Sequence, residues 1–153
     1  MNLRPVAYWI SVLGGSGLAP KAPGTFGTLA SLLLWAPLAL TQTTLSTRIE
    51  FVLALFLLGL WAVPKSLPVF SKEDPGSIVI DEGVGMGITL LFCPPSWLLI
   101  LVGFALFRFF DIVNPWPVSL ADRKVKGAFG VMLDDVLAGL YALLVLTILH
   151  AWF

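Results

Sequence analysis

Five apolar stretches, separated by segments rich in proline, glycine and charge, dominate the pattern of the sequence. They cover residues 26–40, 49–63, 78–92, 96–113 and 131–152. Each is a candidate membrane helix, although several are shorter than the roughly 20 residues needed to cross a hydrocarbon core. We therefore predict an all-α, polytopic membrane helix bundle with about four to five membrane helices and a Gly/Pro-rich re-entrant or interfacial N-terminal segment.

The third stretch is the least suited of the five to crossing a membrane. Its apolar residues Ile78 to Ile80 are followed directly by Asp81 and Glu82. Hydrocarbon does not tolerate two adjacent carboxylates without protection. The sequence therefore leaves open whether this stretch counts as a membrane span.

The composition supports a membrane protein with a single domain. Of the 153 residues, 58% are hydrophobic and 12% are charged, and the mean hydropathy is +0.96, whereas a typical soluble domain has roughly 25% charged residues. A chain of this length has too few residues for a second folded unit, so we assign 1–153 to one domain. The zero net charge gives no indication of a nucleic-acid partner. The lipid bilayer is the expected partner, and the oligomeric state stays open.

The charged residues fall mainly on one side of the predicted bundle. If all five stretches cross and the N-terminus is inside, Arg48 is the only Lys or Arg on the far side. The near side receives all the others: Arg4, Lys21, Lys65, Lys72, Arg108, Arg123, Lys124 and Lys126. Most acidic residues share that side, including Glu73 and Asp74. The positive-inside rule then places this face, with nearly all the reactive side chains, in the cytoplasm.

Two segments on this side could bind a phosphate or a metal. The run from Gly14 to Thr28 is dense in Gly and Pro, which excludes a regular helix until about Phe26 and leaves backbone amides free for a phosphate, with Lys21 nearby. A simple chain break before a helix is the alternative. Asp81 and Glu82 open an apolar helix, where a hard cation such as Mg²⁺ would offset their repulsion. Helix capping by the two acids is the alternative there.

Two further segments contribute one basic and three acidic side chains to this side of the bundle. Arg108 and Asp111 lie three residues apart on one helical face, where a local salt bridge is the simplest interpretation. Asp134 and Asp135 open the last apolar stretch. Asp135 shares a face with Gly139, whose missing side chain would let another helix approach, whereas Asp134 points about 100° away.

The positions of Cys93 and His150 narrow the chemistry. The single cysteine excludes an internal disulfide and a cysteine-rich metal site. It falls in an outer turn and His150 near the far end of the last stretch, so neither can serve the acidic cluster. Cysteine, histidine and Ser-His-Asp hydrolases are thus disfavoured, and metal-assisted phosphoryl chemistry remains.

Together, the segments around Ser16–Thr25, Asp81–Met86 and Arg108–Gly139 resemble the phosphatidylglycerophosphatase A family over nearly the whole chain. The resemblance implies a bacterial inner-membrane enzyme that converts phosphatidylglycerophosphate to phosphatidylglycerol with Mg²⁺. It carries over a set of acidic, basic and glycine positions: Asp81, Glu82, Asp111, Asp122, Asp134, Asp135, Arg108, Gly17, Gly24, Gly127, Gly130 and Gly139. This chain departs from the family at Asn114, where Lys is frequent, and at Gly83, where a bulkier apolar residue is usual.

On this basis we assign roles to individual residues as hypotheses. The predicted metal ligands are Asp81, Glu82, Asp134 and Asp135. The predicted catalytic residues are Asp111, Asp135 and Arg108, with Asp111 accepting a proton from metal-activated water. The predicted substrate-binding residues are Lys21, Gly24, Thr25, Arg108, Asp122 and Arg123. An aspartyl-phosphate route and a cation-coupled transporter that uses the acids as an ion site remain as alternatives.

Overall fold

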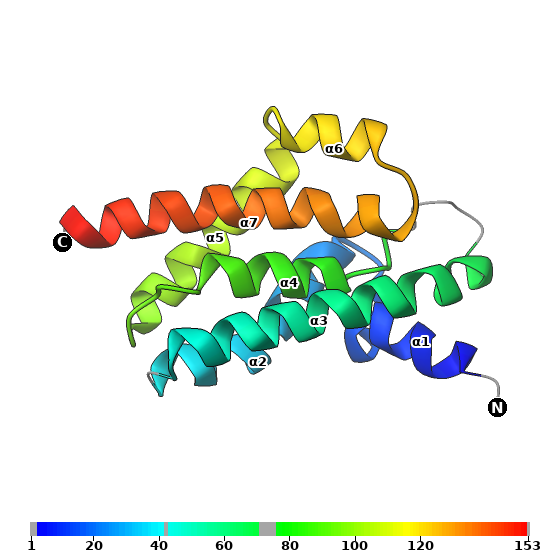
Figure 1. Ribbon diagram of the computed structural model, residues 1–153, viewed down its shortest axis with the longest axis horizontal. Helices are drawn as coiled ribbons and strands as arrows, with labels where there is room; N and C mark the ends of the chain where they lie inside the picture. Colours follow the sequence, from blue (N-terminus) through cyan, green and yellow to red (C-terminus); the bar gives the residue numbers. More distant parts are fainter. Residues whose placement is uncertain (1–2, 42, 71–75, 153) are drawn as a thin grey trace.

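The computed structural model is a bundle of helices and describes residues 3–41, 43–70 and 76–152, apart from the side chains of 121–123. Its elements are α1 (Arg4–Ser11), η1 (Leu13–Leu18), α2 (Pro23–Leu40), α3 (Leu45–Ser66), η2 (Leu67–Val69), α4 (Ile80–Thr89), α5 (Trp97–Val113), α6 (Val118–Lys124) and α7 (Gly127–Trp152) (Figure 1). The described residues contain no strand. The all-α prediction is therefore confirmed.

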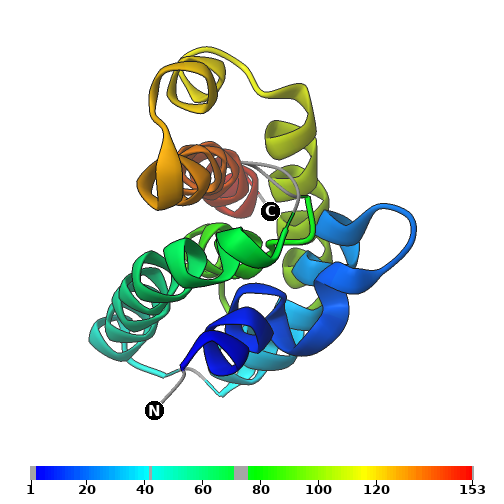
Figure 2. The ribbon, with the colours of Figure 1, turned by 90° about the vertical axis from the view of Figure 1, so that its right-hand side faces the viewer.

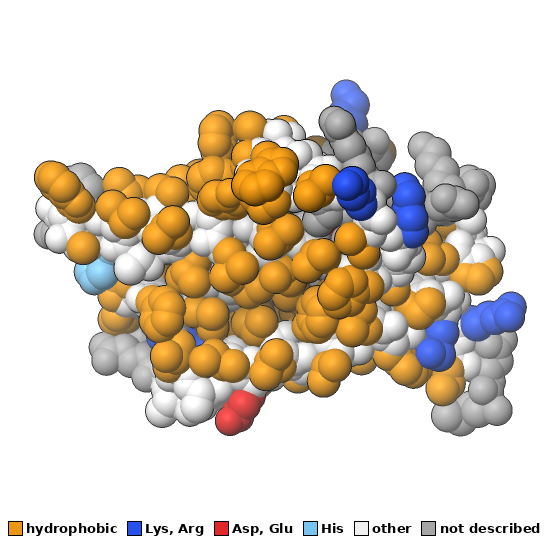
Figure 3. Space-filling model, turned by 45° about the horizontal axis from the view of Figure 1, so that its top comes forward, with side chains coloured by type: hydrophobic (Ala, Val, Ile, Leu, Met, Phe, Trp, Pro, Cys, Tyr) orange, Lys and Arg blue, Asp and Glu red, His pale blue; other side chains and the backbone are white. Residues whose placement is uncertain are grey.

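Three of the described helices are long and apolar enough to cross a membrane. They are α2, α3 with its short continuation to Val69, and α7. Helix α5 has 17 residues and is also strongly apolar. Hydrophobic side chains cover much of the visible surface of the bundle (Figure 3). The predicted count of four to five spans is not confirmed, because only three of the described helices are long and apolar enough to cross a membrane.

The N-terminal segment begins with a helix that the sequence pattern did not single out. Helix α1 packs against α3, and the chain then turns through Gly14 and Gly15, whose φ angles of 67° and 106° suit glycine. Helix α2 starts at Pro23, three residues before the predicted Phe26. Proline is well tolerated in the first turn of a helix, because the amide it lacks has no helical partner there.

Helix α4 is the doubtful third stretch, and it lies in the middle of the bundle (Figure 2). Its ten residues span about 15 Å, too short for a hydrocarbon core of about 30 Å. All ten are buried, and α2, α3, α5 and α7 pack around it. The carboxylates of Asp81 and Glu82 are thus shielded from lipid by protein.

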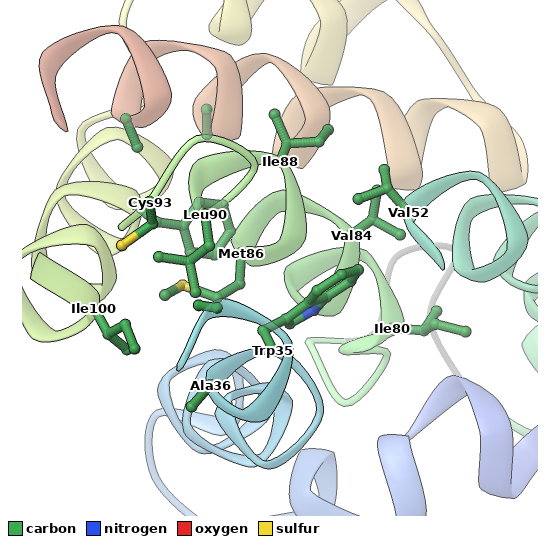
Figure 4. Close-up of a cluster of buried hydrophobic side chains, with 14 of the residues drawn as sticks. Trp35, Ala36, Val52, Ile80, Val84, Met86, Ile88, Leu90, Cys93 and Ile100 are labelled. Carbon is green, nitrogen blue, oxygen red and sulfur yellow. The ribbon is translucent and has the colours of Figure 1, made fainter. Parts of the chain in front are cut away.

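Small residues and one indole fix α4 against its neighbours. Trp35 reaches from α2 toward Val84 and Met86 (Figure 4) and donates a hydrogen bond from Nε1 to the carbonyl of Gly83 at 2.8 Å. On the other side, a Cβ at Gly139 would lie 2.5 Å from the carbonyl oxygen of Gly85. The predicted close approach at Gly139 is therefore found, and α4 is the helix that approaches.

The two ends of the bundle differ in charge. The start of α4, the end of α5 and the starts of α2 and α7 meet at one end, and most of the visible Lys and Arg side chains gather there (Figure 3). Lys72, Glu73 and Asp74, expected at this end, lie outside the described residues. The opposite end carries Arg48 and the turn containing Cys93.

We expect Gly139→Ala to destabilise the fold. The added methyl group would contact backbone atoms of Gly85, which cannot rotate away, so the two helices must separate. Overpacking of this kind costs roughly 1–3 kcal/mol, which would appear as a lower midpoint of thermal unfolding in detergent. Gly76→Ala is the control, since the nearest atom to its Cβ lies 4.0 Å away. Equal midpoints for both variants would contradict the close contact.

Candidate metal and phosphate site

Three carboxylates from two helices meet at the charged end of the bundle. Asp81 and Glu82 lie in the first turn of α4 and Asp135 in the third turn of α7, and one oxygen from each lies within 4.8 Å of the others. They are only 8%, 8% and 4% exposed. Carboxylates held this close out of water must either take up protons or lie next to a compensating positive charge.

Asp134 lies beside this group but is not part of it. Its Oδ1 accepts a hydrogen bond from the amide of Asp135 at 3.0 Å, and its charge acts on Asp81. Among the described residues, the set with ligand atoms close enough to share a metal contains Asp81, Glu82 and Asp135. Three of the four predicted ligands are thus brought together, and the 100° offset of neighbouring helical residues separates Asp134.

The surroundings favour the protonated forms of the two acids on α4. Burial, reinforced by the charge of Asp135, raises the pKa of Glu82 from its ordinary value of 4.5 to about 8. Burial is also the main reason that the pKa of Asp81 lies well above its usual range, and the charge of Glu82 adds to this. A bound divalent cation would reverse both effects, because opposite charge favours the ionised form.

Arg108 joins the carboxylates to α2. Its Nη1 lies 2.6 Å from Asp111 Oδ2 and 3.8 Å from Glu82 Oε1, and it donates to Thr28 Oγ1 at 3.4 Å. The expected Arg108–Asp111 salt bridge is therefore present and extends further. Within the described part of the chain, the buried atoms Arg108 Nε and Glu82 Oε2 have no hydrogen-bond partner. One donor and one acceptor of the site are thus available to a ligand.

Gly24 allows the start of α2 to lie against this cluster. A Cβ there would contact Glu82 Oε1 and would lie 3.1 Å from both terminal nitrogens of Arg108. Thr28, one turn later, donates to the carbonyl of Gly24 at 2.9 Å and accepts from Arg108. Thr28 was not singled out from the sequence, although its spacing of four from Gly24 places both on one helical face.

The remaining predicted substrate-binding residues are not drawn into the cluster. Lys21 is exposed and Thr25 half-buried, and neither side chain forms a hydrogen bond or ion pair with a described residue. Asp122 and Arg123 lie in α6, with side chains outside the described set. Asn114 ends α5 with a left-handed φ of 52°, a conformation that Asn tolerates well.

The three carboxylates could hold a metal ion. Carboxylate oxygens alone are the ligands of hard cations such as Mg²⁺, and the unpartnered Glu82 Oε2 shows that the set is not saturated by the protein. An arginine beside such a centre is suited to phosphate oxygens. The geometry therefore supports binding of a divalent cation next to a phosphate group.

Comparison with known proteins identifies a family. Residues 9–150 match the family model described as Phosphatidylglycerophosphatase A. Proteins named Phosphatidylglycerophosphatase A from Haemophilus influenzae and Escherichia coli are 42% and 36% identical, over 98% and 95% of this chain and 91% and 84% of theirs. A Bacteroides thetaiotaomicron protein, provisionally named a phosphatidylinositol-3-phosphatase, is 40% identical over 88% of this chain and 87% of its own. No solved structure matches the chain.

We expect Mg²⁺ to stabilise the protein, and Glu82→Gln to remove the effect. Because folding raises the pKa of Glu82 from 4.5 to about 8, its charge destabilises the metal-free fold as pH rises through that window. With chelator at pH 7.5, the variant should therefore unfold at or above the wild-type midpoint.

In Mg²⁺ at 100 times its dissociation constant, the wild type should gain about 2.7 kcal/mol, whereas the variant should not respond. Thermal unfolding in detergent, with chelator and with Mg²⁺, measures both effects. Glu50→Gln, an exposed position on α3, should behave as the wild type. A Mg²⁺ response retained in Glu82→Gln would exclude Glu82 as a ligand.

Proposed function

The chain belongs to the phosphatidylglycerophosphatase A family, and from this membership we propose that it hydrolyses the terminal phosphate of phosphatidylglycerophosphate. The products are phosphatidylglycerol and inorganic phosphate. The observation that carries the proposal is the cluster of Asp81, Glu82 and Asp135, with Arg108 adjacent, at one end of an apolar bundle. A phosphomonoester at interfacial depth is the substrate that such a cluster suits.

Asp81, Glu82 and Asp135 would hold Mg²⁺ through their carboxylate oxygens, with Asp134 close enough to add its charge. When bound, Mg²⁺ supplies positive charge to the phosphoryl oxygens and makes a water molecule more acidic. The protein contributes rigidity, because Asp81 and Glu82 lie on a helix whose every residue is buried.

Arg108 would bind the phosphate. Its Nε is buried and without a partner among the described residues, and Asp111 fixes the guanidinium through Nη1 at 2.6 Å. The absence of a side chain at Gly24 leaves space beside both groups. Lys21, Thr25, Asp122 and Arg123 are proposed to contribute to substrate binding, as the sequence suggested.

Hydrolysis needs an acceptor for one proton of the attacking water, and Asp111 suits this role. Its side chain is 24% exposed, at the edge of the cluster, so it can pass the proton on to solvent. The water oxygen forms the new bond to phosphorus, the bond from phosphorus to the glycerol oxygen breaks, and the leaving oxygen takes up a proton to become a hydroxyl group.

The location of the site explains how a membrane protein reaches this substrate. The acyl chains can stay in the bilayer beside the apolar surface while the headgroup meets the carboxylates at the end of the bundle. The excess of Lys and Arg at that end favours the cytoplasmic face of a bacterial inner membrane. The relatives from three bacteria are consistent with this location.

Asp135→Asn should abolish phosphate release while leaving the fold intact. The amide keeps the shape of the side chain but removes the charge that the cation needs. The measurement is phosphate release from phosphatidylglycerophosphate by purified protein, with Mg²⁺ and with excess chelator, and Glu50→Gln is the matched control at the opposite end. Phosphatidylinositol 3-phosphate is assayed in parallel to test the headgroup.

Wild-type activity in the folded Asp135→Asn variant would remove Asp135 from the site. Absence of release from folded wild-type protein with either lipid, in Mg²⁺ or Mn²⁺, would overturn the phosphatase proposal.

Arg108→Lys should lower kcat/KM by roughly 100-fold or more, although the positive charge is kept. A lysine offers a single point charge, whereas the planar guanidinium can hold Asp111 and a phosphate oxygen at once. Steady-state kinetics on the same lipid, with Mg²⁺ saturating, checks this. A loss of less than threefold would show that Arg108 serves only as a local ion pair.

A further inference from the structure

Arg48, at the end of the bundle opposite the carboxylates, is a buried charge that the proposed chemistry does not use. It lies in the first turn of α3 and is 7% exposed. Among the described residues no carboxylate pairs with it. A charge so deeply buried requires other partners.

The partners of Arg48 are oxygens at the ends of two other helices. Nη1 donates to the carbonyls of Leu90, Leu91 and Cys93 at 3.2, 3.1 and 2.9 Å, all in the turn that follows α4. Nη2 donates to Ala39 in the last turn of α2 at 3.3 Å, and Nε to Thr43 Oγ1 at 3.4 Å. Carbonyls at a helix end carry negative partial charge, so they stabilise the guanidinium as it satisfies them.

This contact matters because α4 ends inside the bundle. A membrane-spanning helix places its terminal carbonyls near water, whereas α4 is too short and its end would leave carbonyls unsatisfied in apolar surroundings. From a neighbouring helix, Arg48 supplies donors to the carbonyls of Leu91 and Cys93, and a second donor to that of Leu90, which also accepts the amide of Cys93 at 3.1 Å. It thereby fixes where α4 stops along its own axis.

The axial position of α4 also decides where its first turn lies. Asp81 and Glu82 are separated from the Arg48 contact by one rigid helix of about 15 Å, and they must meet Asp135 on α7 within 4.8 Å. A shift of α4 at one end therefore moves two of the three carboxylates at the other. We infer that Arg48 is a positioning residue that holds α4 at the depth required for metal binding and turnover; this inference rests on the proposed function.

The test compares Arg48→Lys with a destabilising control at the same end of the bundle. Lysine keeps the charge but cannot hold four carbonyls of two segments with one planar group. Ile100→Ala, which truncates a fully buried side chain of α5, is the control. Mn²⁺ affinity is measured by electron paramagnetic resonance on folded protein below its melting temperature, together with kcat and KM.

We expect Arg48→Lys to weaken Mn²⁺ binding by about tenfold, the lower end of the effect seen for residues that bond directly to metal ligands, because Arg48 acts only through α4. The variant should also lower kcat more than it changes KM. Ile100→Ala should lose thermal stability but keep the wild-type affinity. Wild-type affinity and kcat in folded Arg48→Lys would overturn the inference, as would an equal loss in Ile100→Ala.

A second variant covers the case in which Arg48→Lys does not fold. Thr43→Val removes the acceptor of Nε, together with the hydroxyl's own donation to the carbonyl of Leu38 at 2.8 Å, and leaves Arg48 in place. We expect at least a twofold weaker Mn²⁺ affinity, and an unchanged affinity would overturn the inference. Failure of the wild type itself to bind Mn²⁺ or release phosphate would instead contradict the proposed function.

Discussion

The structure depends on one electrostatic constraint, the burial of Asp81, Glu82 and Asp135 within 4.8 Å of one another in an apolar bundle. Arg108 is the only guanidinium that the described residues place against this group, and it is already shared with Asp111. One positive charge cannot offset four carboxylates. The cluster must therefore hold protons or a further cation, and in the proposed function that cation acts on the phosphate together with Arg108.

The short helix α4 makes this arrangement compatible with a membrane. If a membrane-spanning helix carried two acids in its middle, their carboxylates would lie either in hydrocarbon or in the apolar interior of the bundle. Because α4 ends after ten residues, its acidic turn stays at one end and its apolar remainder packs against Trp35 and Gly139. At the far end, Arg48 donates hydrogen bonds to the carbonyls of the turn after α4. In the proposed function, this arrangement lets a phospholipid present its headgroup to the acids without leaving the bilayer.

Much of this could be predicted from the sequence, because apolar runs and adjacent acids are local signals. The all-α class, the pairing of Asp135 with Gly139 and the Arg108–Asp111 salt bridge all follow from the spacing of residues along a helix. The choice of Asp135 over Asp134 also follows from helical geometry, but only once the face turned toward α4 is known.

Other features depend on contacts between distant segments, which one sequence does not contain. Arg48 finds three of its four carbonyl partners more than 40 residues away, so its charge could be counted but its role could not be inferred. Thr28 likewise reaches Arg108 across 80 positions. The apolar pattern of α4 continues to residue 92 and does not reveal the end of the helix at Thr89, after which the amides of Leu91 and Cys93 form turn hydrogen bonds to Ile88 and Leu90.

The most direct measurement is a crystal structure of the protein grown with Mn²⁺, with the metal located by its anomalous scattering. We expect an anomalous peak between the carboxylate oxygens of Asp81, Glu82 and Asp135, within the 2.0–2.6 Å range of metal–oxygen bonds. A catalytically active preparation whose metal lies elsewhere, with these three carboxylates bound only to protein groups, would contradict the central claim.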